Sequence, residues 1–205
     1  MSATPPRINE YLLLTAAFMV GAVVMSLEML ASRYLNPYFG GTIFTWAALI
    51  SVVLFALMAG YYLGGAAADR LSYKPLLETC IIVAAVYILL LPLFVDATLE
   101  AAVTSIDNLG LAALVGALVV TFVPVTFLAT FTPIAIKYSL HSLNRSGRVS
   151  GIVFAVATAG NIVGTLGTSF FLIPAFGTRF LTEMLGTVLF LSAGVVRLSR
   201  RQPRT

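Results

Sequence analysis

The chain has 205 residues, of which 60% are hydrophobic and only 10% are charged, and its mean hydropathy is +1.00. A water-soluble domain could not cover that much apolar surface, so the composition excludes an ordinary soluble fold and indicates a membrane protein. The net charge of +4 does not point to nucleic acid as a partner, because the basic residues lie in short loops and at the C-terminus. With only one cysteine (Cys80) and one histidine (His141), we expect no disulfide framework, no metal site and no cofactor.

Six apolar runs predict an all-α, polytopic helix bundle in one domain, residues 11–198, between a polar tail at 1–10 and a basic tail at 199–205. In chain order the predicted spans are Tyr11–Ser32, Ile43–Gly65, Pro75–Val95, Leu109–Tyr138, Val149–Phe176 and Phe180–Leu198. The fourth run is overlong and holds Pro124 and Pro133, which predicts a kink or a break. Between the third and fourth runs, residues 96–108 indicate either a short amphipathic piece at the membrane interface or a plain acidic loop.

The basic residues also predict the orientation of the spans. Ten of the twelve lysines and arginines fall on one side of the membrane, and only Arg33 and Arg179 fall on the other. By the positive-inside rule, both termini are predicted to be cytoplasmic, which an even number of spans allows. We expect a multi-pass protein of the bacterial inner membrane.

Glu28 is the sharpest candidate for chemistry, because an ionisable side chain inside a span is expensive and usually faces a bundle interior, a cavity or a partner. It lies near the outer end of the first predicted span, five residues before Arg33. One interpretation is a cation or proton site, with Glu28 paired to Arg33 in some states. The other is a fixed ion pair or hydrogen bond that orders the bundle. Asn161, in the middle of the fifth run, likewise predicts either an interhelical hydrogen bond or contact with a ligand.

Closely spaced glycines predict where helices approach each other. Gly160 and Gly164 form a GxxxG pattern with Gly167 three residues further on, and Gly60 and Gly64 form a second one. This spacing lets the backbone of another helix come close inside lipid.

The segment after the second run carries Asp69, Arg70 and Lys74 at the predicted cytoplasmic edge. An acid at the end of a helix can hold an arginine or the N-terminus of a neighbouring helix, so this cluster is a candidate cytoplasmic gate. The alternative is a loop that sets the topology and caps two helices. Aromatic residues around the first outer loop, Trp46 among them, are typical of an interfacial belt, although a cation–π pocket would use the same residue types.

Four blocks, in this order, carry a resemblance to a known family: SLEMLASRYLNPYFG at 26–40, GYYLGGAAADR at 60–70, FLATFTPIAIKY at 127–138 and GRVSGIVFAVATAGNIVGTLGTSFFLIPAFGT at 147–178. They resemble the membrane modules that are fused to spermidine-synthase-like domains in bacteria. The resemblance implies a six-span module similar to half of a major-facilitator transporter. The aminopropyltransferase-like domain of that family has no counterpart in this sequence, so we do not expect spermidine synthesis from this chain.

These observations leave two main functions open. The first is transporter-like handling of a small solute, with a cation as one version, in which Glu28 binds the cation or proton and Asn161 lines the path. The second is a non-catalytic membrane anchor or accessory subunit for a separate soluble enzyme or a larger membrane complex. Besides the lipid bilayer, the expected partner is a second copy of the chain or another membrane or soluble protein, including a spermidine-synthase-like enzyme. An intramembrane enzyme is the third alternative, and no motif supports it.

Overall fold

The structure, a computed structural model, describes residues 10–70, 73–139 and 146–198, and every element in these ranges is helical. The long elements are α1 (Glu10–Phe39), α2 (Ile43–Arg70) and α3 (Tyr73–Ser105). The chain continues through α4 (Leu109–Ala117), the π-helical segment η1 (Leu118–Phe122), α5 (Val123–Ala129) and α6 (Phe131–Ser139). It ends with α7 (Ser146–Gly167), the π-helical segment η3 (Thr168–Leu172), α8 (Ile173–Phe176) and α9 (Thr178–Leu198). The prediction of an all-α fold is confirmed.

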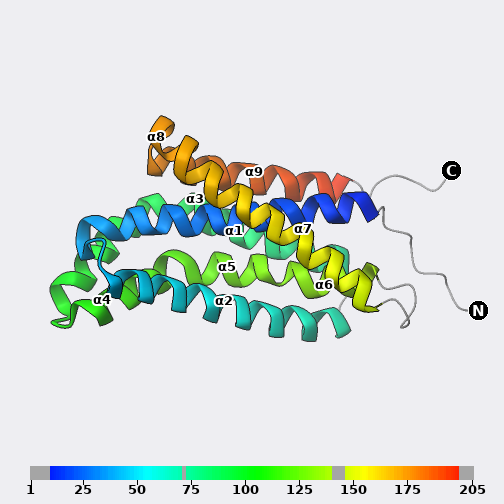
Figure 1. Cartoon of the computed structure of the whole chain (residues 1–205), viewed down its shortest axis with the longest axis horizontal. Coiled ribbons are helices and arrows are strands. Elements are labelled where there is room, and N and C mark those ends of the chain that lie inside the picture. Colours follow the sequence, from blue (N-terminus) through cyan, green and yellow to red (C-terminus); the bar gives the residue numbers. More distant parts are fainter. Residues whose placement is uncertain (1–9, 71–72, 140–145, 199–205) are drawn as a thin grey trace, which may run out of the picture.

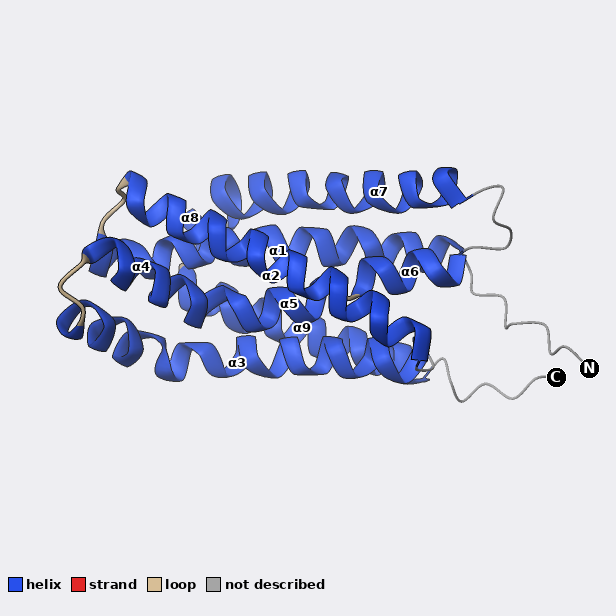
Figure 2. Ribbon diagram, turned by 90° about the horizontal axis from the view of Figure 1, so that it is seen from below, coloured by secondary structure: helices blue, strands red, loops and turns tan. Residues whose placement is uncertain are grey.

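The helices lie side by side in an elongated bundle (Figure 1). The beginning of α1 and the end of α9 lie at the same end, which we call the tail end, and α4 and α8 lie at the other, which we call the far end. α7 forms one edge of the bundle and covers α1, whereas α3 forms the opposite edge (Figure 2). α3 packs mainly on α9, and α2 packs on α4, η1, α5 and α6.

In the part of the chain that the structure describes, five stretches are long and apolar enough to cross a membrane: Leu13–Phe39, Ile43–Arg70, Pro75–Ser105, Leu109–Lys137 and Ser146–Phe176. They correspond to the first five predicted spans, so the multi-pass membrane fold is supported. α9 contains the sixth predicted span, but it carries Arg179 and Glu183 in its first two turns and is not among the five. Its crossing of the membrane therefore stays a prediction.

Two helices extend well beyond their predicted ends. α1 continues past Ser32 to Phe39, and α3 continues past Val95 to Ser105. Of the two alternatives predicted for residues 96–108, the acidic loop is wrong as far as Ser105, because this part is helical and continuous with α3. Spans of 27 to 31 residues are about 40–46 Å long at 1.5 Å per residue, more than the ~30 Å of hydrocarbon, so their polar ends reach the headgroups.

The predicted break in the fourth span is confirmed, and its geometry repeats in the fifth. η1 ends two residues before Pro124, and η3 ends two residues before Pro174. Proline has no N–H and its ring clashes with the carbonyl four residues earlier, and a widened π turn relieves both problems. At η1, the hydroxyl of Tyr87 on α3 donates to the Val119 carbonyl and gives this carbonyl a partner. The break in the fifth span was not predicted.

Candidate functional site

The sequence predicted Glu28 near the outer end of the first span, but the apolar helical stretch Leu13–Phe39 continues well beyond the predicted end at Ser32. The span Leu13–Phe39 has its midpoint at residue 26, so Glu28 is about 3 Å from the middle along the helix axis. The side chain is 9% exposed, and its neighbours Leu27 and Ala31 are fully buried. A carboxylate at this depth is costly for the fold. Because α1 is longer than predicted, Glu28 is followed by about three further helical turns and does not lie at a helix end.

The predicted pairing of Glu28 with Arg33 is not formed. A separation of five residues on a continuous helix turns the second side chain by about 140° from the first, and Arg33 is exposed whereas Glu28 is buried. Among the described residues the ion pairs are those of Asp69 with Lys137 and of Asp96 with Arg179. Glu28 and Arg33 therefore belong to different surroundings.

Asn161 lines a small, partly open cavity between the helices. The cavity has a volume of about 60 Å³ and lies between α1, α2, α5, α6 and α7, which is room for about two water molecules. Its polar lining comes from Tyr61 on α2, Thr132 on α6 and Asn161 on α7. Gly21 on α1 makes room for the amide, because a Cβ on this glycine would lie 2.8 Å from Asn161 Oδ1. We call this space the central cavity.

Glu28 and the central cavity share one side of α1. Gly21 and Val24 line the cavity, and Glu28 follows Gly21 by seven residues, which brings it back to nearly the same face about 10 Å closer to the far end. Glu28 therefore lies on the same side of α1 as Gly21, which Asn161 of α7 approaches, but about two helical turns away from it.

Arg33 lines a second and larger cavity, of about 270 Å³, at the far end. We call it the far-end pocket. One wall is the last part of α1 with Arg33 and Asn36, a second is the start of α2 with Trp46, and a third is Ser169 of η3 with Ile173 of α8. Gly40, with φ of +70°, forms the tight turn that brings α2 back beside α1.

The candidate gate residues at the tail end have a partner that the sequence did not reveal. Lys137 on α6 lies 2.8 Å from the Asp69 carboxylate, and its ammonium also donates to the Ala68 carbonyl at 2.6 Å. Arg70 is exposed, and Lys74 lies in the first turn of α3 with its side chain outside the described set. The observed arrangement ties the end of α2 to α6, and such an exposed ion pair adds little stability.

The glycine patterns mark two close helix contacts. A Cβ on Gly160 would lie 2.0 Å from the Phe18 carbonyl oxygen, and one on Gly164 would lie 2.2 Å from that of Ala22, so α7 meets the backbone of α1 there. Gly60 and Gly64 approach the backbone of Thr126 and Thr130 in the same way. The expectation for Gly167 needs correction, since a Cβ there would meet nothing within 4 Å, so this glycine makes no close backbone contact with another helix.

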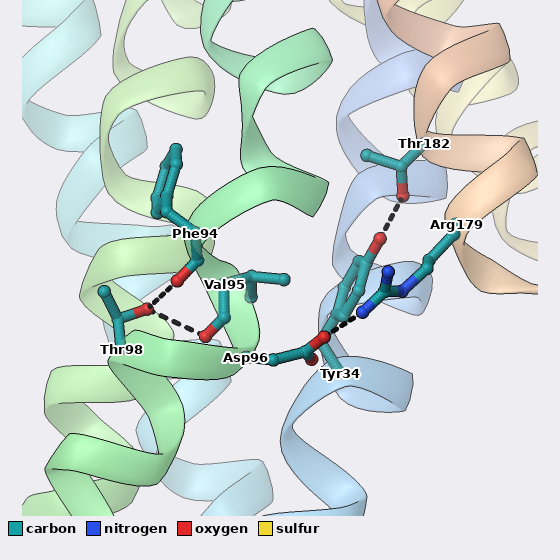
Figure 3. A network of polar contacts seen from close by, with 7 residues as sticks. All are labelled: Tyr34, Phe94, Val95, Asp96, Thr98, Arg179 and Thr182. Carbon is teal, nitrogen blue, oxygen red and sulfur yellow. Dashed lines mark hydrogen bonds and ion pairs between the residues drawn. The ribbon is translucent and has the colours of Figure 1, made fainter.

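Polar side chains join α1 to its neighbours in the far half of the bundle. Ser26 accepts a 2.7 Å hydrogen bond from Thr168 of η3. Nearer the far end, the Tyr34 hydroxyl donates to Thr182 of α9 at 3.1 Å, while Arg179 pairs with Asp96 of α3 beside it (Figure 3). The last two contacts link α9 to α1 and to α3 in the far half of the bundle.

Glu78 on α3 is a second buried carboxylate that the sequence reasoning did not single out. It is 8% exposed and lies four residues inside the apolar run that begins at Pro75. The signal that selected Glu28, an acid within a predicted span, would have selected Glu78 as well. Glu78 precedes Leu89 by eleven residues, which is close to three full helical turns, so both lie on nearly the same face of α3. Because Leu89 meets Gly186 of α9, this is the face of α3 that packs against α9.

Fold and cavities together define a multi-pass helical membrane protein with a buried acid in its first span. Comparisons of the chain with protein-family models, with curated proteins and with solved structures find no match.

Proposed function

We propose that the protein is a transporter-like module of the bacterial inner membrane, with six spans and cytoplasmic termini, that handles a small cationic solute or a proton. The observation that carries this proposal is the buried Glu28 in the middle of a span, on the face of α1 that leads to the Asn161 cavity. In this proposal Glu28 binds the cation or proton, and Asn161 and Tyr61 line the path on the tail side.

The size of the central cavity adds a requirement. A volume of about 60 Å³ holds water but no metabolite, so a solute larger than a proton needs α7 or α2 to move away from α1. Six helices rarely enclose an alternating-access path by themselves, so this function calls for a second copy of the chain or another membrane partner. The resemblance to half of a major-facilitator transporter agrees with that requirement.

Flux through proteoliposomes tests the proposal. The wild-type protein is expected to move a labelled polyamine, a labelled amino acid or protons, and Glu28→Gln is expected to lower that flux at least tenfold, because the amide cannot carry the charge. The matched control is Glu183→Gln, the same change at an exposed acid of α9, which is expected to leave the flux within twofold. Absence of any wild-type flux, or equal fluxes for wild type and Glu28→Gln, would exclude this function.

A non-catalytic anchor or accessory subunit is the second candidate, and the outer face of α7 favours it. α7 packs mainly on α1, whereas Phe154, Ile162 and Leu166 on its other side are exposed and Gly151 has open space around it. In this version the partner is a soluble spermidine-synthase-like enzyme or a larger membrane complex, in line with the family resemblance. Affinity purification from native membranes is expected to bring down one partner in a fixed ratio, and purification of the chain alone would rule the subunit role out.

A further inference from the structure

We propose that the far-end pocket is a binding site for a phosphate group, separate from the Glu28 site and opposite to it in charge preference. The proposal rests on the shape of the pocket and on the side chains that line it, and it does not depend on transport.

The charge of the pocket sets the class of ligand. Within the described part of the chain, Arg33 is the only charged residue that lines the pocket, and no carboxylate oxygen lies within 4.0 Å of its guanidinium. The Arg33 guanidinium lies at the edge of an apolar bundle and has no acidic partner, so it is suited to bind an anion. Its planar fork presents two parallel N–H groups to an oxyanion.

The other polar groups favour phosphate over a carboxylate. Asn36 on α1 and Ser169 on η3 line the same pocket, and their side chains add an amide and a hydroxyl donor to the guanidinium. Donor groups on separate walls suit a phosphate, whose four oxygens point in tetrahedral directions, whereas a carboxylate offers two oxygens in one plane. The hydroxyl of Ser32, which also lines the pocket, already donates to the Met29 carbonyl and is not one of these donors.

The remaining walls suit a ligand with an apolar part. Met29, Trp46, Leu49 and Ile173 line the pocket beside the polar groups, and the pocket lies at the end of the spans, where headgroups meet hydrocarbon. The phosphate could come from a phospholipid headgroup or from a free phosphomonoester. The volume of about 270 Å³ is close to the lower limit for small-molecule sites, so it accommodates a headgroup of glycerol phosphate size.

Trp46 provides a direct measurement, because it is the single tryptophan of the chain and it lines the pocket. Purified protein in detergent is titrated with short-chain phosphatidylglycerol, with diacylglycerol of the same chain length and with glycerol 3-phosphate, and Trp46 emission is recorded. We expect a saturable change with phosphatidylglycerol that is at least tenfold weaker with the diacylglycerol, which lacks the phosphate. Saturable binding of glycerol 3-phosphate as well identifies free phosphomonoesters as a source, and its absence assigns the site to lipid.

Two variants and one control distinguish specific binding in the far-end pocket from non-specific binding of anions to the basic protein. Arg33→Gln is expected to raise the Kd at least tenfold, and Arg148→Gln, at an exposed arginine of α7 near the tail end, is expected to leave it within twofold. Ser169→Leu fills the pocket from the opposite wall without changing the charge, and it is also expected to raise the Kd at least tenfold. If Arg33→Gln does not fold, as judged by circular dichroism and size exclusion, Ser169→Leu alone decides.

Three results would overturn the proposal: no saturable Trp46 change with any of the phosphate compounds, equal effects of Arg33→Gln and Arg148→Gln, or a Kd that Ser169→Leu leaves unchanged. None of them bears on flux through Glu28. The two proposals therefore fail independently.

Discussion

Adding one methyl group at Gly160 tests the contact between α1 and α7 on which the central cavity depends. In Gly160→Ala the new Cβ would lie 2.0 Å from the Phe18 carbonyl oxygen, whereas real Cβ atoms are practically never closer than 3.0 Å to such a neighbour. The two helices must therefore separate by about 1 Å, and overpacking of this kind costs about 1–3 kcal/mol. Alanine also favours a helix over glycine by up to about 1 kcal/mol, which offsets part of that cost.

Gly167→Ala is the matched control, because it makes the same change seven residues further along α7 where nothing lies within 4 Å. The helix-propensity gain is common to both variants, so the difference between their free energies of unfolding isolates the contact and should be about 1–3 kcal/mol. Unfolding in mixed micelles of increasing dodecyl sulfate content, followed by circular dichroism, measures that difference. Equal stabilities of the two variants would refute the close approach of α7 to α1.

Two further predictions concern single hydroxyl groups and use the same unfolding assay. Tyr87→Phe removes the hydroxyl that donates to the Val119 carbonyl of the π segment, and it is expected to lower the free energy of unfolding by about 1–3 kcal/mol. The control is Tyr62→Phe, at a side chain that is 77% exposed, which should leave the stability unchanged. Equal effects of the two variants would contradict the assigned hydrogen bond. Tyr34→Phe removes the 3.1 Å hydrogen bond to Thr182, whose hydroxyl keeps its own bond to the Thr178 carbonyl. No polar group is left without a partner, so a smaller loss of stability, about 1 kcal/mol, is expected. A larger loss for Tyr34→Phe than for Tyr87→Phe would contradict this order.

Hydropathy located the helices well because the composition of each apolar run is a local property of the chain. It placed the ends of α1 and α3 poorly, since Arg33, Asn36 and Asp96 lower the hydropathy but do not stop a helix. Their polar groups can reach headgroups or water while the backbone hydrogen bonds continue. Pro124 predicted the break at η1. Pro174 stands in the same position relative to η3, so the second break was predictable from the sequence in the same way.

The candidate site was predictable only in part. A charge within an apolar run identifies Glu28 from the sequence, but its depth depends on where α1 ends. The partner of Asp69 could not be deduced, because Lys137 is 68 residues away and only the packing of α6 on α2 brings the two together. The far-end pocket is non-local in the same way, because its walls come from three separate parts of the chain.

The contact between α1 and α7 also has a consequence for the order of synthesis. Ser26 and the Thr168 hydroxyl that bonds it are 142 residues apart, which corresponds to roughly 7–28 s at a translation rate of about 5–20 residues per second. During that time α1 is in the membrane without the helix that covers Gly21 and Ser26. The nascent chain therefore has to shelter this face in the translocation machinery or against the next spans until α7 emerges.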